Sequence, residues 1–339
     1  MKLITFKHMG QLKIGAVLND SHGVDFSILD ESIPPTMLGL IENHQHFLPI
    51  LNKMLLTPPS KSIVNLSEVE IQSPIPNPVS MRDAYAFRQH VATARKNRGL
   101  EMIPEFDLFP VTYFTNHLTV TGPGRVLVQE HHLKKLDYEL EVAVVLGKPL
   151  WNATIEECDA AIFGYMIMND WSARYLQMEE MKLSLGPAKG KDFATSLGPW
   201  LVTKDELNLR STPLGCVLDA TMKAFVNDRL LSEGNVNSMN WTFAQILQRT
   251  SYGIRLHPGE VIGSGTVGTG CLLELNGSKI TDNLWLQPGD QVKMEIENLG
   301  VLLNTVIRQE ERLQGVPATL VGGSLGDLFR HSPSGESGH

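Results

Sequence analysis

The chain has 339 residues, of which 42% are hydrophobic and 19% are charged, a composition typical of a soluble globular protein with a sizeable core. Its formal net charge of −8 and the lack of a basic block argue against a nucleic-acid partner. No apolar run reaches the roughly 20 residues of a membrane helix, no signal-peptide pattern opens the chain, and the three scattered cysteines fit neither a zinc motif nor a disulfide framework. These features predict a cytoplasmic protein without a membrane partner.

Residues 1–72 are predicted to form a small N-terminal β-domain. Its short segments alternate with turn residues, which predicts strands at 2–6, 12–17, 23–26 and 69–71 and helices at 36–43 and 46–55. Residues 73–78 read Ser-Pro-Ile-Pro-Asn-Pro, and proline at every second position favours a stiff, extended backbone. This segment is therefore predicted to be a linker.

A second, larger domain is predicted over residues 79–330, and the small polar residues of 331–339 predict a disordered tail. Residues 99–110 are irregular and predict a surface loop. The expected strands are 111–114, 126–128, 138–146, 161–169, 200–203, 220–226, 260–263, 271–275 and 291–297, and the expected helices are 83–98, 155–160, 173–181 and 241–250. So many short strands with few helices predict a β-rich α+β fold with a rolled or barrel-like sheet.

Two acids interrupt the apolar strand expected at 138–146. Glu139 and Glu141 are two residues apart, so on a strand their side chains share one face, roughly 7 Å apart. Burying two like charges on one face is unfavourable, and a divalent cation would remove that penalty. The alternative is a sheet edge with two solvated acids, which the apolar run after Glu141 disfavours.

Asp170 ends another apolar strand and precedes an expected helix. It could hold a functional position at the strand end or simply cap the helix. Together, Glu139, Glu141 and Asp170 form an all-oxygen set. Such sets suit Mg²⁺, Mn²⁺ or Ca²⁺ better than Zn²⁺.

Asp83 and His90 are seven residues apart, so on one helix they could share a face. His90 could equally be a solvated helix histidine. Glu274 lies on the apolar strand expected at 271–275, where it could orient a histidine base or face outward.

The motifs of several common enzyme classes are missing. The glycine-bearing turn that contains Lys189 and Lys191 lacks the P-loop spacing. There is also no nucleophile elbow and no dinucleotide fingerprint after a strand. A serine hydrolase or a nicotinamide-dependent dehydrogenase is therefore disfavoured.

Several short motifs together resemble the fumarylacetoacetate hydrolase superfamily. They are Asp83-x-Tyr85-x-x-Arg88-Gln89-His90, Glu139-x-Glu141, Asn169-Asp170-Trp171-Ser172-Ala173-Arg174, Leu185-Gly186-Pro187 with Gly190-Lys191, and Gly263-Ser-Gly-Thr266. The resemblance runs from about Ser73 to Arg308, and the first strands also resemble the small β-domain of fumarylacetoacetases. It implies a mixed β-sandwich roll that forms a homodimer.

The resemblance also implies a role for each matched side chain. The ligands of a divalent cation (Mg²⁺, Mn²⁺ or Ca²⁺) would be Asp83, Glu139, Glu141 and Asp170. His90 would be the general base, with Glu274 as its partner, and Lys191 or Arg88 could stabilise the oxyanion. Tyr85, Gln177 and Thr266 match substrate-contacting positions.

The implied reaction is hydrolysis of a carbon–carbon bond in a β-diketo acid. Water activated by His90 attacks a carbonyl, and the leaving carbanion departs as an enolate stabilised by the metal. The expected substrate is fumarylacetoacetate, which would give fumarate and acetoacetate. The alternatives are a related acylpyruvate or fumarylpyruvate hydrolase, an oxaloacetate decarboxylase, or a metal-stabilised binding module without activity.

Three positions depart from the fumarylacetoacetase pattern. The arginine expected nine residues after His90 is Gly99, and the tyrosine expected four residues after Gln177 is Met181. The loop at 114–116, Phe-Thr-Asn, also differs. The pocket for the distal carboxylate of the substrate is therefore expected to differ.

Overall fold

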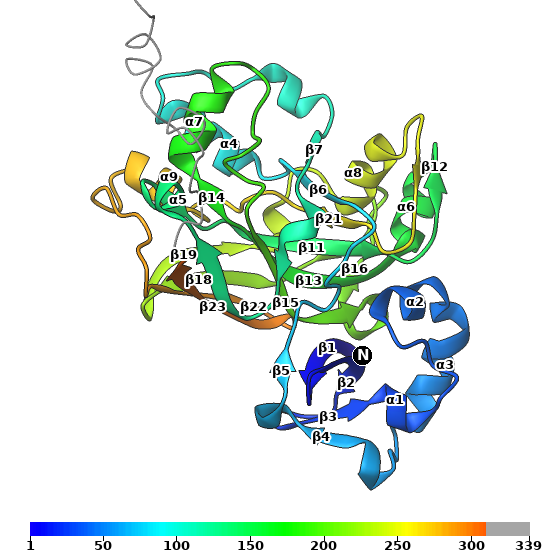
Figure 1. Ribbon diagram of the computed structural model, residues 1–339. Coiled ribbons are helices and arrows are strands. Elements are labelled where there is room, and N and C mark those ends of the chain that lie inside the picture. Colours follow the sequence, from blue (N-terminus) through cyan, green and yellow to red (C-terminus); the bar gives the residue numbers. More distant parts are fainter. Residues whose placement is uncertain (310–339) are drawn as a thin grey trace, which may run out of the picture.

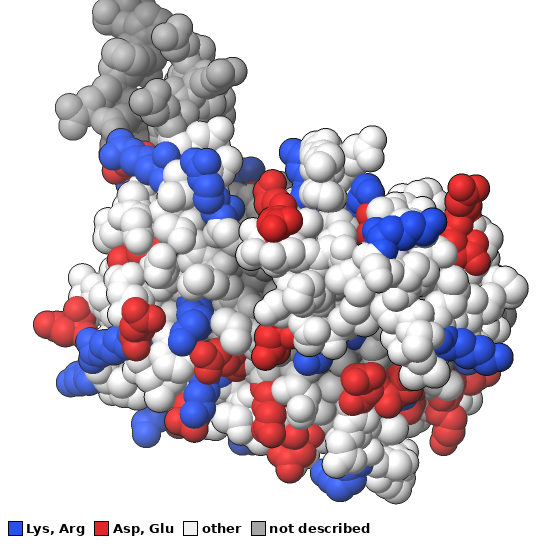
Figure 2. Space-filling view, turned by 90° about the horizontal axis from the view of Figure 1, so that it is seen from below, with Lys and Arg blue, Asp and Glu red and all other residues white. Residues whose placement is uncertain are grey.

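The computed structural model describes residues 1–309, and its mixed β-sheets with peripheral helices confirm the predicted β-rich α+β class (Figure 1). The tail predicted at 331–339 and the last part of the domain predicted at 79–330 lie outside the described residues. Within residues 1–309 no helix has the length and apolar character needed to cross a bilayer. The face in Figure 2 carries acidic and basic side chains interspersed among neutral ones.

The N-terminal part forms an antiparallel sheet with three helices beside it. Its elements are β1 (Lys2–His8), β2 (Gln11–Val17), β3 (His22–Asp25), α1 (Phe26–Leu29), α2 (Met37–Glu42), α3 (His44–Met54), η1 (Ser60–Ser62), β4 (Ile63–Asn65), η2 (Leu66–Glu68) and β5 (Glu70–Ile71). Strand β1 pairs antiparallel with β15 (Thr195–Thr203), so these strands extend the large sheet of the rest of the chain. The boundary at residue 72 stays a prediction.

The central strands run in the order β1-β15-β13-β11-β21-β6-β7 and carry the functional side chains described below. Their bounds are β6 (Met81–Ala84), β7 (Thr112–Phe114), β8 (Val120–Thr121), β11 (Leu140–Leu146), β13 (Ile162–Asp170) and β21 (Val261–Gly263). The pairs within this part of the sheet are antiparallel, except that β21 pairs with β6, and β8 with β15, in parallel.

Strand β11 is buried on both faces, which explains its continuous apolar sequence. Val142 and Val144 pack into the core shared with the second sheet. Ala143 and Val145 pack into the core that contains N-terminal residues such as Leu51. A charge on this strand therefore has no solvent-facing side to occupy.

The second sheet has the order β19-β18-β22-β23-β9 and packs against the central sheet (Figure 1). Its strands are β9 (Gly124–Val128), β18 (Thr221–Val226), β19 (Arg229–Asn235), β22 (Gln291–Ile296) and β23 (Gly300–Arg308). The alternating buried residues of β18 and β22 face the shared core. Two facing mixed sheets confirm the predicted β-sandwich roll.

The remaining helices and short strands lie around the sheets. They are α4 (Arg88–Lys96), η3 (Pro104–Asp107), η4 (His117–Thr119), α5 (Glu130–Leu133), β10 (Leu136–Asp137), β12 (Leu150–Trp151), α6 (Ile155–Ala161), β14 (Ser172–Ala173), α7 (Arg174–Met181), η5 (Lys204–Glu206), β16 (Leu209–Arg210), β17 (Val217–Leu218), η6 (Val236–Ser238), α8 (Phe243–Thr250), β20 (Arg255–Leu256) and α9 (Leu272–Gly277).

Two predicted elements are wrong, and both errors concern functional residues. The helix predicted at 83–98 begins only at Arg88, because Asp83 belongs to β6 and pairs with Gly263 of β21. The strand predicted at 271–275 is the helix α9. The buried carboxylate of Asp137 accepts hydrogen bonds from the first two backbone N–H groups of this helix, so a distant residue stabilises its start.

Candidate metal centre

Three buried carboxylates meet on one face of the central sheet. One oxygen each from Asp83, Glu141 and Asp170 lies within 4.8 Å of the other two. They come from β6, β11 and β13, and β21 lies between β6 and β11. A Cβ atom at Gly263 of β21 would lie 2.4 Å from Asp83 Oδ1. This glycine therefore leaves the space in which Asp83 approaches the other two acids.

The three acids fit a hard divalent cation. Glu141 Oε2 and Asp170 Oδ1 are buried and have no hydrogen-bond partner among the described residues. Burial, and then the neighbouring carboxylates, raise the pKa of Asp83 and hold the pKa of Glu141 well above its usual range. Ionising all three acids together is thus unfavourable by itself. An oxygen-binding ion such as Mg²⁺, Mn²⁺ or Ca²⁺ would supply the missing charge and the missing partners.

Glu139, the fourth predicted ligand, lies just before β11 and faces two cations. Lys191 contacts Glu139 Oε2 and donates to Asp170 Oδ2 over 2.8 Å, so its ammonium joins these two acids. Arg174 Nη2 donates to Glu139 Oε1 over 2.7 Å. Burial opposes the ionisation of Glu139, but Lys191 and Arg174 outweigh it and lower its pKa. The structure thus groups three of the four predicted ligands, and Glu139 reaches the group through Lys191.

Arg174 and Asp137 form an ion pair that the sequence reasoning missed. Arg174 Nε donates to Asp137 Oδ2 over 2.8 Å, and both side chains are buried. The same guanidinium donates to Gln177 Oε1 over 3.0 Å. Arg174 is part of the sequence motif, but the sequence does not show its contact with Asp137. Through this contact Arg174 connects Glu139 and Gln177 to the start of the helix α9.

Arg174→Met is expected to destabilise the fold by about 3–5 kcal/mol, because it leaves Asp137 and Glu139 buried without their guanidinium partner. Urea unfolding monitored by circular dichroism gives the free energy of unfolding. The matched control is Arg88→Met, which removes an arginine from an exposed pair with Asp107 and is expected to cause no measurable change. Equal losses in the two variants would contradict the structural role of Arg174.

A histidine–glutamate pair lies close to the carboxylates. His90, in the first turn of α4, has Nδ1 2.6 Å from Glu274 Oε2, and both side chains are buried. Glu274 reaches His90 from α9, which packs against α4. With Nδ1 held by a carboxylate, the opposite ring nitrogen of His90 is the one available to a substrate or a water molecule.

A cavity of about 630 Å³ is lined by the histidine–glutamate pair and by Asp83, and Glu141 and Asp170 lie outside its wall. Its wall includes the predicted base pair His90 and Glu274, the predicted substrate contacts Tyr85, Gln177 and Thr266, and the charged side chains of Asp83, Glu139, Arg174 and Lys191. The rest of the wall is largely apolar and includes Ala94, Val111, Met178, Met181, Pro187 and Leu273. Most of the predicted site residues thus face one space.

Tyr113 was not predicted, although it lines the same cavity. Its hydroxyl donates to Asp170 Oδ2 from β7, at the end of the sheet order. Burial, and then the charge of Asp170, raise the pKa of Tyr113 well above its usual range, so it remains a hydrogen-bond donor. The sequence offered no signal for this contact beyond an aromatic residue in a short strand.

The structure does not place Arg88, a predicted oxyanion-stabilising residue, in the wall of the cavity. Arg88 Nε donates to Asp107 Oδ1 over 2.9 Å, and both side chains are about half exposed. Among the described residues Arg88 is not part of the cavity wall. The pair ties α4 to the turn η3, and Lys191 remains as the predicted cation that lines the cavity.

Comparison with known proteins gives matches over most of the chain. The sequence pattern described as "Fumarylacetoacetate (FAA) hydrolase C-terminal" matches residues 80–307. The chain is 26% identical over 327 residues to the oxaloacetate tautomerase YisK of Bacillus subtilis (strain 168), covering 90% of this chain and 100% of that protein. It is 35% identical over 204 residues to the fumarylacetoacetase of Arabidopsis thaliana, covering 47% of each.

The fold is similar to that of the maleylpyruvate hydrolase from Sphingobium sp. SYK-6, solved in complex with manganese (II) ion and pyruvate. The TM-score is 0.68 at 20% sequence identity, covering 91% of this chain and 100% of that one. The three clustered carboxylates and the histidine–glutamate pair all lie within the matched residues 80–307.

Proposed function

The chain belongs to the fumarylacetoacetate hydrolase family, and from that premise we propose that it is a metal-dependent hydrolase that cleaves a carbon–carbon bond in a β-diketo acid. The observation that carries this proposal is the buried His90–Glu274 pair, 2.6 Å apart, which shares one cavity with Asp83 of the carboxylate cluster. Fumarylacetoacetate, which would give fumarate and acetoacetate, is the first substrate we propose.

The side chains of the cavity support a sequence of proton transfers. A divalent cation held by Asp83, Glu141 and Asp170 would supply Lewis-acid stabilisation of the substrate oxygens. His90, oriented by Glu274, accepts a proton from water as the hydroxide adds to the carbonyl carbon. The ammonium of Lys191 offsets negative charge near that oxygen. The carbon–carbon bond then breaks, its electron pair leaves with the enolate fragment, and His90 returns the proton to carbon.

The distal carboxylate of fumarylacetoacetate needs a cation at the far end of the cavity. The family pattern places an arginine at the position of Gly99, but the neighbouring Arg98 is exposed and contributes to the cavity wall. Its guanidinium is therefore the group we assign to that carboxylate. Met178 and Met181 line the cavity and would contact the carbon chain of the substrate.

A second candidate function is keto–enol tautomerisation of oxaloacetate. The resemblance to the tautomerase of Bacillus subtilis favours it, because that match covers 90% of this chain and all of that protein. This reaction needs only the transfer of a proton between carbon and oxygen, in which His90 could remove or return the carbon-bound proton without adding water.

The test is a substrate panel of fumarylacetoacetate, an acylpyruvate whose acyl group is uncharged, and oxaloacetate, each assayed with Mg²⁺ and with Mn²⁺. We expect cleavage of the diketo acids, with fumarate and acetoacetate released from fumarylacetoacetate. Accelerated loss of the oxaloacetate enol signal without cleavage of any diketo acid would instead support the tautomerase. No turnover in protein that holds stoichiometric metal would contradict both functions and favour a metal-stabilised binding module.

A further inference from the structure

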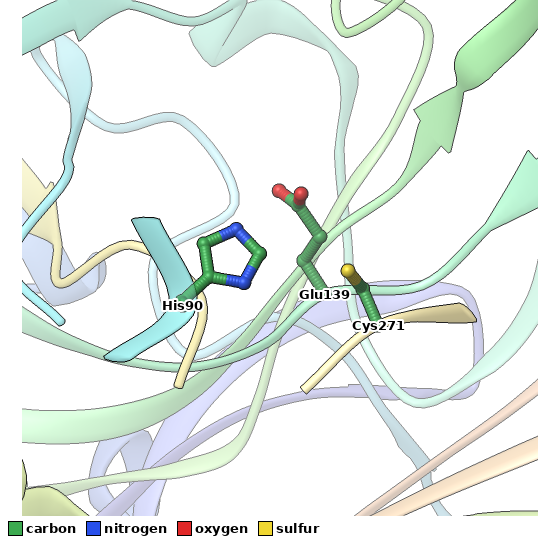
Figure 3. A group of neighbouring side chains, drawn as sticks. All are labelled: His90, Glu139 and Cys271. Atoms are coloured by element: carbon green, nitrogen blue, oxygen red, sulfur yellow. The ribbon is translucent and has the colours of Figure 1, made fainter. Parts of the chain in front are cut away.

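A second group of ligand-type side chains lies beside the three-carboxylate cluster. His90, Glu139 and Cys271 each offer one ligand atom within 4.8 Å of the other two, and all three residues are buried. Figure 3 shows the imidazole and the carboxylate facing one another, with the sulfur of Cys271 beside them. The three come from α4, from the residue before β11 and from the residue before α9.

The donor set differs in kind from the carboxylate cluster. Imidazole nitrogen, thiolate sulfur and carboxylate oxygen are the ligands that zinc takes in proteins, whereas Mg²⁺ and Ca²⁺ take oxygen alone. His90 Nδ1 already pairs with Glu274 Oε2, which leaves the opposite nitrogen for a metal. A carboxylate behind a ligating histidine is the usual arrangement that fixes its ring and strengthens its bond to zinc.

The separations suit one small ion after a modest adjustment. Zinc bonds of about 2.0–2.3 Å place ligand atoms roughly 3.3–3.8 Å apart. The ligand atoms of the three residues now lie within 4.8 Å of one another, so they would have to approach by about 1 Å. Both oxygens of Glu139 already face cations, but a carboxylate accepts more than one partner at each oxygen. Burial holds the pKa of the Cys271 thiol well above its usual range, so zinc would displace its proton on binding.

We propose that His90, Glu139 and Cys271 form an inhibitory site for a thiophilic divalent cation, zinc above all, next to the site for the hard cation. Zinc there binds the His90 nitrogen that would otherwise accept a proton from water. Binding and turnover therefore exclude each other. The inhibition rests on the proposed function, but the binding does not.

Cobalt binding tests the site without any substrate. Metal-free protein is saturated with Mg²⁺ to fill the carboxylate cluster and is then titrated with Co²⁺. We expect a near-ultraviolet thiolate-to-cobalt absorption that saturates at one cobalt per chain and disappears when Zn²⁺ is added. Cys271→Ser is expected to lose this absorption while α9 still forms, because serine is a favoured residue at the N-cap that Cys271 occupies.

The matched control is Cys216→Ser, which alters a thiol that contacts Asp159 on another part of the chain and is expected to keep the absorption. Absence of the band in the unaltered protein, or its persistence in Cys271→Ser, would overturn the site.

With an active preparation, zinc is expected to inhibit in the presence of excess Mg²⁺, and Cys271→Ser is expected to raise the half-inhibiting zinc concentration at least about tenfold. An unchanged half-inhibiting concentration would overturn the inhibitory role. The cobalt band keeps the two proposals distinguishable. A band without turnover of any substrate would contradict only the proposed function, and turnover without a band would contradict only the zinc site.

Discussion

His90→Ala is expected to lower kcat/KM for the cleaved diketo acid by about 10²–10⁴-fold, the usual contribution of a positioned general base. The reason is that Glu274 holds Nδ1 of His90 and leaves the other nitrogen available to water in the cavity. Steady-state rates of product release measure the loss, and metal binding, followed by thermal shift, is expected to persist because the three clustered carboxylates are intact.

Two further variants sharpen this result. Glu274→Gln keeps the size of the side chain but removes the charge that stabilises a protonated His90, so a smaller loss is expected. His46→Ala, on an exposed position of α3, is the matched control and is expected to retain full activity. Full turnover by His90→Ala would rule out water activation by this histidine.

Glu141→Gln is expected to have opposite effects on the metal-free and the metal-bound protein. Burial, and then the charge of Asp83, hold the pKa of Glu141 well above its usual range, so this acid destabilises the metal-free fold. Glutamine does not ionise and so avoids this penalty, and the metal-free protein is therefore expected to be at least as stable as before. The same change removes an anionic ligand, so the stabilisation by Mg²⁺ or Mn²⁺ is expected to be lost.

The measurement is the Tm with chelator and with excess metal. For the unaltered protein, metal at one hundred times its Kd contributes about 2.7 kcal/mol, or a Tm rise of about 4 °C for a chain of this size. Glu31→Gln, an exposed acid in the N-terminal part, is the matched control and is expected to show the full rise. The same rise in Glu141→Gln would place the metal elsewhere.

The parts of the site that could be predicted from the sequence depend on local patterns. Two acids in an apolar strand stand out because β11 is buried on both faces, so the anomaly at Glu141 is visible in the sequence itself. Asp170 ends β13 as predicted, and it does not cap the next helix, whose N-cap is Ala173. The sandwich of mixed sheets followed from the resemblance and is confirmed.

The parts that could not be predicted depend on contacts between distant segments. The helix predicted from Asp83 is overridden by parallel pairing with β21, and the strand predicted around Glu274 is overridden by the cap that Asp137 provides. The pairing of Arg88 with Asp107, which lies in the segment predicted to be an irregular loop, was likewise not visible in the sequence. The homodimer, the domain boundary and the individual ligand roles stay predictions.

The position of β21 between β6 and β11 has a consequence for the newly made chain. When synthesis has passed Asp170, the new chain contains all three clustered acids. It still lacks β21, the strand that pairs with both β6 and β11 and so holds Asp83 next to Glu141. Val261–Gly263 must emerge before that cluster can close. A cation held by these three acids would therefore stabilise the fold only after this late strand has been made.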